Sequence, residues 1–278
     1  MISPMRDRAA AAETLHRSVG TRQGGDKAMV PMLEIGRLTV RFGGVTALDA
    51  VGLVAGPGEV VGLIGPNGAG KSTLFDCVTR RRDPDDGVIR VAGQDVLARP
   101  PHAVAGSGVA RTFQHPAVFP GLSVRENVMT GAHRFGAEGF WRAAFARDGE
   151  RRLRAHADRV LDRFGLLGLG DHPAAGLPYG VLKRVEIARA VAAEPRLLLL
   201  DEPAGGLGPE EALALSGLIR DLHRATGLTV VVVEHHMEFV LGLCGRIVCL
   251  DLGHKIADGP THVVRRDPAV IAACLGAR

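Results

Sequence analysis

The stretch GPNGAGKST, residues 65–73, carries the clearest chemistry in this sequence of 278 residues. It follows the apolar run VVGLI and precedes TLFDCVT, so a strand, a loop and a helix are expected in that order. Its glycines let the main chain approach an anion and direct N–H groups at phosphate oxygens, helped by the positive end of the following helix. Lys71 supplies a charge for the β and γ phosphates, and Ser72 a hydroxyl for Mg²⁺. The predicted nucleotide-binding residues are Gly65, Pro66, Asn67, Gly68, Ala69, Gly70, Lys71, Ser72 and Thr73.

Lysine is rare in this chain. Of its 34 lysines and arginines, only four are lysines, namely Lys27, Lys71, Lys183 and Lys255. In a chain that otherwise uses arginine, a lysine in the phosphate loop favours a specific geometric role for that side chain.

Two acidic residues follow the apolar run LLLL. In RLLLLDEP, Asp201 and Glu202 stand at the end of a predicted buried strand, and ligands bind at the carboxyl edge of such sheets. Asp201 is expected to hold Mg²⁺, directly or through water, and Glu202 to orient or deprotonate the attacking water. A DE pair alone could equally end a strand and cap a helix. Together with the phosphate loop, the pair predicts hydrolysis of a nucleoside triphosphate.

Strand-like and helical segments alternate along the chain, which predicts an α/β fold. The apolar runs at 197–200 and 230–233 suit central parallel strands that are buried on both faces. Residues 115–193 show helical spacing without a convincing strand, so an inserted helical subdomain is expected there. The predicted strands are residues 33–42, 60–65, 87–91, 109–113, 196–201, 228–234 and 245–251.

The composition favours a globular protein that stays in the cytoplasm. Hydrophobic residues make up 46% of the chain, but their runs are far shorter than the ~18 residues that span a bilayer. Residues 1–31 lack the apolar core of a secretion signal and are expected to be a disordered tail or a misassigned start, with Met29 or Met32 as alternative first residues. The four cysteines show no CxxC pair, which favours reduced, structural thiols. The net charge of +4 permits contact with nucleic acid or anionic lipid and does not choose between them.

With GPNGAGKST, LPYGVLKRVEIARA (177–190) and LLLLDEP in this order, the chain resembles the ATPase subunits of ABC transporters from about Met32 to Arg278. The resemblance implies a P-loop NTPase ABC nucleotide-binding domain with an inserted helical subdomain and a small antiparallel β part. In that family, ATP lies between the phosphate loop of one subunit and a signature loop of the other, which usually resembles LSGGQ. Here that loop is LPYGV, with Tyr179 and Gly180 as expected ATP contacts.

Other family positions follow from the resemblance alone. Gln114 in RTFQH matches the residue that links the γ-phosphate and Mg²⁺ to the helical subdomain and the membrane partner. His235 in VVVEHHM matches the switch histidine, which contacts the γ-phosphate and helps to position water. Phe42 stands where an aromatic ring stacks on adenine, and AGGLGPEE (204–211) matches a loop that crosses the dimer interface.

Within the family, the chain resembles the ATPase subunits of branched-chain amino acid importers, so uptake of these or other hydrophobic amino acids is expected. Importers of urea or short amides are close relatives and remain an alternative. The implied partners are a second ATPase subunit, expected to be a different chain, two integral membrane permease subunits and, indirectly, a solute-binding protein. The implied location is the cytoplasmic face of the inner membrane. The resemblance implies no nucleic-acid partner. The stretches that carry this narrower resemblance are residues 40–51, 65–79, 110–128, 179–180, 184–190, 234–247 and 250–276.

The chain departs from the family pattern at the signature loop. Relatives read LSYGQ where this chain reads LPYGV, so Pro178 replaces a serine hydroxyl and Val181 a glutamine. A hydrogen bond to a charged group is worth ~2 kcal/mol, so its loss from the transition state would slow hydrolysis about 30-fold. In a heterodimer this defect affects only the partner's ATP site, which predicts asymmetric hydrolysis, whereas in a homodimer both sites carry it. Further departures are Gly205 and Gly208 in the interface loop and His236 after the switch histidine.

Two other function classes stay open. A regulatory ABC subunit that no longer hydrolyses ATP is favoured by Pro178 and disfavoured by Lys71, Asp201, Glu202 and His235. A soluble ABC ATPase acting on DNA or ribosomes would usually carry two cassettes or long insertions, and this sequence has one cassette and neither insertion.

Overall fold

The computed structural model describes residues 29–132 and 147–275. Residues 1–28 of the tail expected at 1–31, and the part of the expected helical subdomain at 133–146, therefore lie outside the described residues. The chain divides into two compact units, which are described in turn. The first comprises the described residues up to Val104 and from Gly245 onward, and the second comprises the described residues of 105–244.

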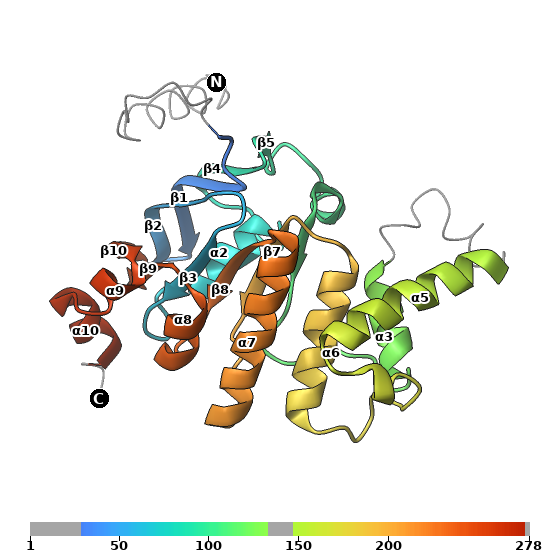
Figure 1. Ribbon diagram of the computed structural model, residues 1–278. Coiled ribbons are helices and arrows are strands. Elements are labelled where there is room, and N and C mark those ends of the chain that lie inside the picture. The colour runs from blue at the N-terminus through green and yellow to red at the C-terminus, as the bar shows by residue number, and fades with distance from the viewer. Residues whose placement is uncertain (1–28, 133–146, 276–278) are drawn as a thin grey trace. The chain divides into compact units, whose positions relative to one another are not determined.

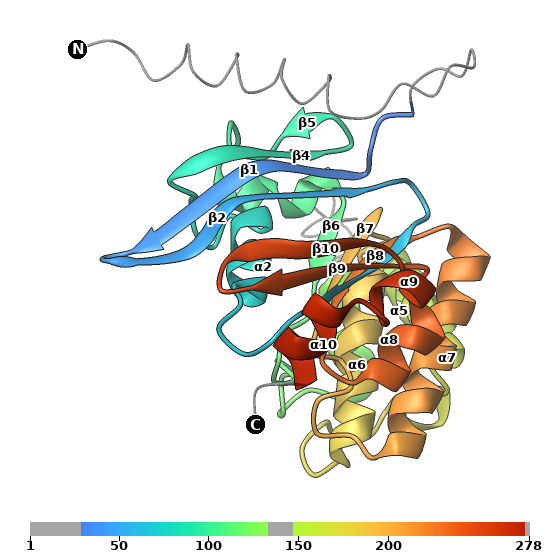
Figure 2. The same cartoon turned by 90° about the vertical axis from the view of Figure 1, so that its left-hand side faces the viewer.

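The first unit contains an antiparallel sheet of four strands in the order β2-β1-β4-β5 (Figure 2). The central strand, β1, alternates buried and partly exposed side chains at its start, as a strand with one buried face should. This sheet confirms the expected small antiparallel β part. Its strands are β1 (Leu33–Phe42), β2 (Val45–Ala55), β4 (Asp86–Val91) and β5 (Gln94–Asp95).

The same unit contains the strand that leads into the phosphate loop. All five residues of β3 (Val60–Ile64) are buried, and β3 pairs in parallel with β9 (Arg246–Asp251). β10 (His254–Pro260) returns antiparallel to β9 as a hairpin. The helical elements of this unit are α2 (Lys71–Val78), η1 (Pro101–Ala103), α9 (Thr261–Val264) and α10 (Pro268–Leu275).

In the second unit, three parallel strands bring acidic residues to one edge. β7 (Leu197–Asp201) pairs in parallel with β6 (Val109–Arg111) and with β8 (Thr229–Val233). Every residue of β7 and β8 is buried, which confirms the central parallel strands predicted from the two apolar runs. Asp201 lies opposite Val233 in the register, so the acids that follow the two strands emerge at the same edge.

The second unit also contains a group of packed helices. α3 (Val124–Gly131) contacts both α5 (Arg147–Arg163) and α6 (Tyr179–Ala192), and the three lie side by side in Figure 1. α3 begins at a capping box, in which the Ser123 hydroxyl accepts from the Glu126 N–H and the Glu126 carboxylate accepts from the Ser123 N–H. The other helical elements of this unit are η2 (Ala105–Ser107), η4 (Leu167–Leu169), α7 (Pro209–Thr226) and α8 (Met237–Leu243).

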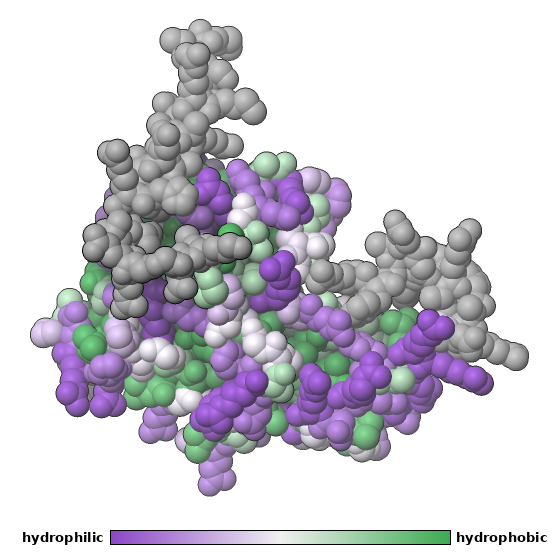
Figure 3. Space-filling model, turned by 45° about the horizontal axis from the view of Figure 1, so that its top comes forward, coloured by the Kyte–Doolittle hydropathy of each residue, from purple (hydrophilic) through white to green (hydrophobic). Residues whose placement is uncertain are grey.

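Three strands were not among those predicted, namely β2, β5 and β10. The pairing of β1 with β2 contains register shifts, which interrupt the period-two pattern, and β10 includes a glycine and a proline. Among the described residues, no helix combines the length and apolar character needed to cross a bilayer. On the face shown in Figure 3, hydrophilic residues are interspersed with smaller hydrophobic areas.

Candidate nucleotide-binding and hydrolysis site

The phosphate loop, residues 65–70, joins β3 to α2 in the first unit, as predicted. Its three glycines have φ angles of 145° at Gly65, 81° at Gly68 and 99° at Gly70, a region that L side chains rarely adopt. A Cβ at Gly65 would lie 2.1 Å from the Leu250 carbonyl oxygen. A Cβ at Gly68 would meet no described atom within 4 Å. The loop is therefore tight against β9 at one end and open at its tip, where a phosphate could approach.

Lys71 is buried at the first position of α2 and folds back over the loop. Its Nζ donates to the main-chain oxygens of Gly65 at 2.7 Å and Pro66 at 2.8 Å. These bonds hold the ammonium beside the loop whose N–H groups are predicted to bind phosphate. The first turn of α2, KSTL, contains no acidic residue, so the positive end of the helix is available to an anion.

Phe42 ends β1, and its ring is 48% exposed. The Arg82 guanidinium lies over this ring, 3.7 Å from its centroid, and Arg82 also donates to the Arg41 carbonyl. An aromatic ring has two faces, and Arg82 covers one of them. An exposed ring of this kind can stack on a base, and the contact with Arg82 was not predicted from the sequence.

The second unit places Asp201 at the end of β7 in a buried ion pair. Its carboxylate accepts from Arg111 Nη2 at 2.8 Å, and both side chains are less than one-tenth exposed. The Asp201 N–H donates to the Thr112 hydroxyl. Arg111 ends β6, the neighbouring strand, so the ion pair joins the carboxyl ends of two parallel strands.

Glu202 lies at the centre of the predicted hydrolytic residues of this unit. Its Oε2 accepts from Gln114 Nε2 at 3.0 Å, and its Oε1 lies 4.0 Å from His235 Nδ1. The structure thus brings together three residues that the resemblance names, from three separate parts of the sequence. Glu202 also has a φ of 47°, an uncommon conformation for a residue other than glycine.

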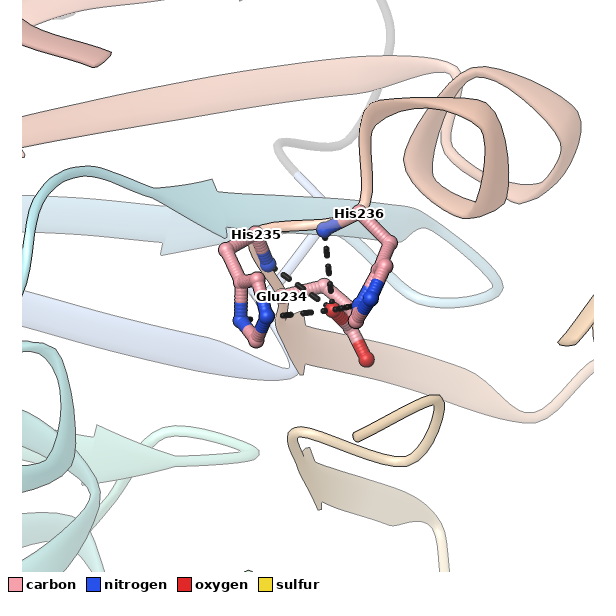
Figure 4. A group of neighbouring side chains, drawn as sticks. All are labelled: Glu234, His235 and His236. Carbon is pink, nitrogen blue, oxygen red and sulfur yellow. Dashed lines mark hydrogen bonds and ion pairs between the residues drawn. The ribbon is translucent and has the colours of Figure 1, made fainter. Parts of the chain in front are cut away.

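A buried carboxylate, Glu234, organises the end of β8 (Figure 4). Its Oε2 accepts from the N–H groups of His235 at 2.8 Å and His236 at 3.0 Å, and lies 3.0 Å from His236 Nδ1. Its Oε1 accepts from the Ala204 N–H at 2.7 Å. The three side chains have the spacing of metal ligands, but the Glu234 oxygens already serve main-chain N–H groups. We therefore assign Glu234 to fixing the main chain at His235, the predicted switch histidine.

The stretch LPYGV, the expected signature loop, leads into α6, which begins at Tyr179. Pro178 is the N-cap, and its carbonyl accepts from the Val181 and Leu182 N–H groups. Pro178 supplies neither a hydroxyl nor a main-chain donor at this helix end. The exposed Tyr179 ring packs against Gly206, where a Cβ would lie 2.9 Å from Tyr179 Cε1.

A family model described as ABC transporter matches residues 48–205. The match covers more than half of the chain and runs from before the phosphate loop to beyond Glu202. This chain belongs to the ABC transporter family. Within it, residues 254–278 match a further model, described as branched-chain amino acid ATP-binding cassette transporter.

Curated ABC relatives extend this result over most of the chain. BraF is a high-affinity branched-chain amino acid transport ATP-binding protein of Pseudomonas aeruginosa. It is 40% identical to this chain, and the match covers 88% of this chain and 98% of BraF. LivG of Escherichia coli K12, with the same description, is 39% identical at the same coverage. PhnC of Alcaligenes faecalis, a phosphonates import ATP-binding protein, is 38% identical over 84% of this chain and 87% of its own.

Solved ABC cassettes share the fold. A crystal structure of the ADP conformation of an ABC transporter cassette is 29% identical, with a TM-score of 0.78 over 88% of this chain and 99% of that chain. A dimeric post-hydrolysis cassette bound to ADP and phosphate is 26% identical, with a TM-score of 0.72 over 83% and 99%. The predicted fold class is confirmed, and this ABC subunit is an ATP-binding ATPase.

The ABC fold also implies a Mg²⁺ ion, and the residues predicted to hold it offer suitable donors. Ser72 is an exposed residue and offers a hydroxyl, and Asp201 offers a carboxylate. Gln114 turns its amide nitrogen toward Glu202, which leaves its amide oxygen for a ligand. Oxygen donors of these kinds suit Mg²⁺. A metal ion at Asp201 would compete with the Arg111 guanidinium for the same carboxylate.

Four residues that contact the predicted site residues were not assigned a role from the sequence, namely Arg82, Arg111, Lys183 and Glu234. Three of them contact residues distant in the chain, as when Arg111 binds Asp201 across 90 positions. Such contacts leave no local pattern. Lys183 is one of only four lysines, but its sequence neighbours predict no partner for it.

Proposed function

We propose that this chain is the ATPase subunit of an importer for branched-chain or other hydrophobic amino acids. The match of residues 254–278 to the branched-chain amino acid model carries this proposal. Overall identity cannot carry it, because PhnC is nearly as similar to the chain as BraF and LivG are. The C-terminal segment is the part of the chain that distinguishes this solute class.

Transport by the reconstituted complex tests the solute class. The chain would be assembled in proteoliposomes with the permease and ATPase subunits encoded beside it, and ATP-driven uptake of labelled leucine would be measured through the matching solute-binding protein. Excess isoleucine or valine should compete, and urea, acetamide and methylphosphonate should not. A complex carrying Glu202→Gln is the control without hydrolysis. Uptake of urea or a phosphonate in place of leucine would contradict the proposal.

The partners are part of the proposal. A second ATPase subunit is supported by the dimeric relative, and we propose that this subunit has a different sequence. Two integral membrane permease subunits, and a solute-binding protein acting through them, are supported by the transport names of the relatives. Such an assembly would hold this chain at the cytoplasmic face of the inner membrane. The packed helices α3, α5 and α6 would belong to the helical subdomain at about residues 115–193. In the assembly this subdomain would face the permeases.

The proposed chemistry divides between binding and hydrolysis. The N–H groups of residues 65–73 and the Lys71 ammonium would bind the ATP phosphates, while Phe42 stacks on adenine. Mg²⁺, held by Ser72, Asp201 and Gln114, would neutralise charge on the β and γ phosphates. Glu202 would orient and deprotonate the attacking water, and His235 would contact the γ-phosphate. Tyr179 and Gly180 would contact the ATP bound by the partner.

We propose further that hydrolysis is asymmetric. Pro178 offers no donor to an ATP held by the partner subunit, whereas this chain retains Lys71, Glu202 and His235 for its own ATP. The site built on this chain's phosphate loop should therefore turn over faster than the partner's site. Equal turnover of the two sites in the assembled complex would contradict this asymmetry.

Pro178 also favours a second candidate function, a regulatory ABC subunit in which the signature loop prevents hydrolysis. The structure gives this loop a regular helix start at Tyr179, and a Cβ at Gly180 would lie 2.8 Å from Glu211 Oε1, so this glycine is closely packed. An intact helix end still attracts phosphate. The proposal of an active ATPase subunit is therefore preferred. Measured ATP hydrolysis by the complex would distinguish it from a regulatory subunit that does not hydrolyse ATP.

A further inference from the structure

Lys183 is a fully buried lysine on the signature helix, with a side chain only 1% exposed. It lies four residues after Tyr179, so the two side chains share one face of α6, and Lys183 Nζ is 5.7 Å from the Tyr179 ring centroid. A buried ammonium must be hydrogen-bonded to be tolerated. The partners of Lys183 therefore show what this charge does.

The Lys183 ammonium donates to two main-chain oxygens of the hydrolytic site. One is the Gln114 oxygen at 2.6 Å, and the other is the Glu202 oxygen at 3.1 Å. Gln114 and Glu202 are also joined to each other through their side chains at 3.0 Å. One lysine of the signature helix thus holds the main chain of both residues at the predicted γ-phosphate end.

The conformation of Glu202 explains why the hydrogen bond from Lys183 to its main-chain oxygen matters. Its φ of 47° is sparsely populated by residues with side chains, and such a conformation persists only where neighbouring contacts impose it. The Glu202 oxygen accepts from Lys183, and its N–H donates to the Val233 oxygen. Lys183 is therefore one of the contacts that hold the catalytic carboxylate in its unusual position.

A second buried charge on α6 supports the same connection. The Glu186 carboxylate accepts from the N–H groups of Phe113 at 3.0 Å and Ala117 at 3.3 Å, on both sides of Gln114. Burial lowers the pKa of Lys183 and raises that of Glu186, while each opposes the shift of the other. The carboxylates of Asp201, Glu202 and Glu234 also favour the charged lysine.

We propose that Lys183 is a positioning residue that couples the two ATP sites of the dimer. Binding of the partner's ATP at the start of α6 is transmitted through Lys183 to the main chain of Glu202 and Gln114, and so sets hydrolysis in this chain's own site. The Tyr179 ring, packed on Gly206 just beyond Glu202, provides a second contact along this route. The inference rests on the proposed dimeric ATPase.

The test uses the assembled complex with Lys183→Met, which keeps the length of the side chain and removes its donors. Lys183→Gln, which keeps one amide donor, is the second variant in case the first does not fold. Lys255→Met is the matched control, because Lys255 is a surface lysine paired with Asp258 at 3.0 Å. Thermal unfolding and affinity for a fluorescent ATP analogue would show that each variant is folded and loaded.

The readouts are kcat, KM for Mg-ATP, and a coupling factor. This factor is the rate of hydrolysis at this chain's site with the intact partner, divided by the rate with a partner whose own phosphate loop cannot bind ATP. Loss of two hydrogen bonds from a charged donor should lower kcat at least ~10-fold in Lys183→Met with KM within ~2-fold, and bring the coupling factor close to one. Lys183→Gln should lie between this variant and the wild type.

Two results would overturn the inference in different ways. Folded Lys183 variants with the kcat and coupling factor of the wild type would remove the role of Lys183 and leave the ATPase proposal standing. A wild-type complex without ATP hydrolysis would remove the proposed function itself, and this inference with it.

Discussion

Gly65 shows at the scale of one residue why the phosphate loop has its sequence. A Cβ at this position would meet the Leu250 carbonyl at 2.1 Å, and the φ of 145° is itself unfavourable for a side chain. Gly65→Ala should therefore lower stability by about 1–3 kcal/mol from backbone strain alone and weaken ATP binding by displacing the loop. Thermal unfolding and titration with a fluorescent ATP analogue measure both effects.

The matched control is Gly168→Ala, at an exposed glycine where a Cβ would meet no described atom within 4 Å. It should leave both quantities unchanged. Wild-type affinity and melting temperature in Gly65→Ala would show that the loop tolerates a side chain, against the close approach described here.

The thiols give a second prediction at this scale. Burial raises the pKa values of Cys77, Cys244 and Cys249 to about 12, so these thiols are protonated at neutral pH and should be unreactive. Cys274 is only half-buried. Ellman's reagent at pH 8 should label at most one thiol per folded chain quickly, and all four after unfolding in guanidinium. Rapid labelling of several thiols in the folded protein would contradict the burial of these side chains.

Single residues also mark the limit of what the sequence could predict. Lys71, Asp201 and Glu202 could be assigned because each sits in a local pattern with a fixed place beside a strand. The unusual φ of Glu202, and the bonds from Lys183 that accompany it, depend on residues 19 and 69 positions apart. No spacing rule connects such residues before the chain is folded.

At the scale of elements, the cap of α3 should contribute to stability. The Ser123 hydroxyl accepts from the Glu126 N–H, and losing an N-cap of this kind costs about 1 kcal/mol. Ser123→Ala should lower the free energy of unfolding by that amount in urea titrations, whereas Ser123→Asp, which keeps an acceptor, should stay close to the wild type. Equal losses in both variants would mean that the hydroxyl bond is not what stabilises the helix start.

The same cap gives a pH dependence. Hydrogen bonds from Ser123 lower the pKa of Glu126, so the carboxylate contributes stability above its ordinary pKa of about 4.3, and this contribution is lost as the pH falls through the lowered value. The free energy of unfolding of wild type minus that of Glu126→Gln should therefore be constant near neutral pH and shrink in acid. A difference that grows toward low pH would contradict this sign.

The buried ion pair between Arg111 of β6 and Asp201 of β7 gives a third prediction, about its contribution to stability. Removing one partner leaves a buried charge uncompensated, so Arg111→Met should lower the free energy of unfolding by about 3–5 kcal/mol. Arg90→Met is the control, because Arg90 and Glu34 form a more exposed pair, 3.4 Å apart, that is worth about 0–1 kcal/mol. Similar losses from both variants would show that burial of the Arg111 pair has no energetic consequence.

Elements were predictable where their pattern is regular. The apolar runs that became β7 and β8 are unbroken, and the helical spacing of residues 179–192 predicted α6. β2 and β10 were missed because bulges, a glycine and a proline disturb their alternation. Their positions are fixed by pairing with β1 and β9, which is tertiary information.

At the scale of the whole molecule, the proposed function needs a second ATPase subunit. In the proposed dimer, the phosphate loop, Glu202 and His235 of this chain would act on one ATP, while its signature loop would contact the ATP that the partner holds. Pro178 would then weaken only the partner's site, so the effect of this one residue depends on the identity of the partner subunit. In the proposed importer, the permeases rather than the ATPase subunits would contact the transported solute.

The most direct measurement is Mg-ATP hydrolysis by this chain with its partner subunits, comparing wild type, Glu202→Gln and Pro178→Ser. We predict that the wild-type complex hydrolyses ATP, that Glu202→Gln removes most of this activity, and that Pro178→Ser raises it only modestly. A complex that is inert as wild type and becomes active with Pro178→Ser would contradict the account and identify LPYGV as a loop that switches hydrolysis off.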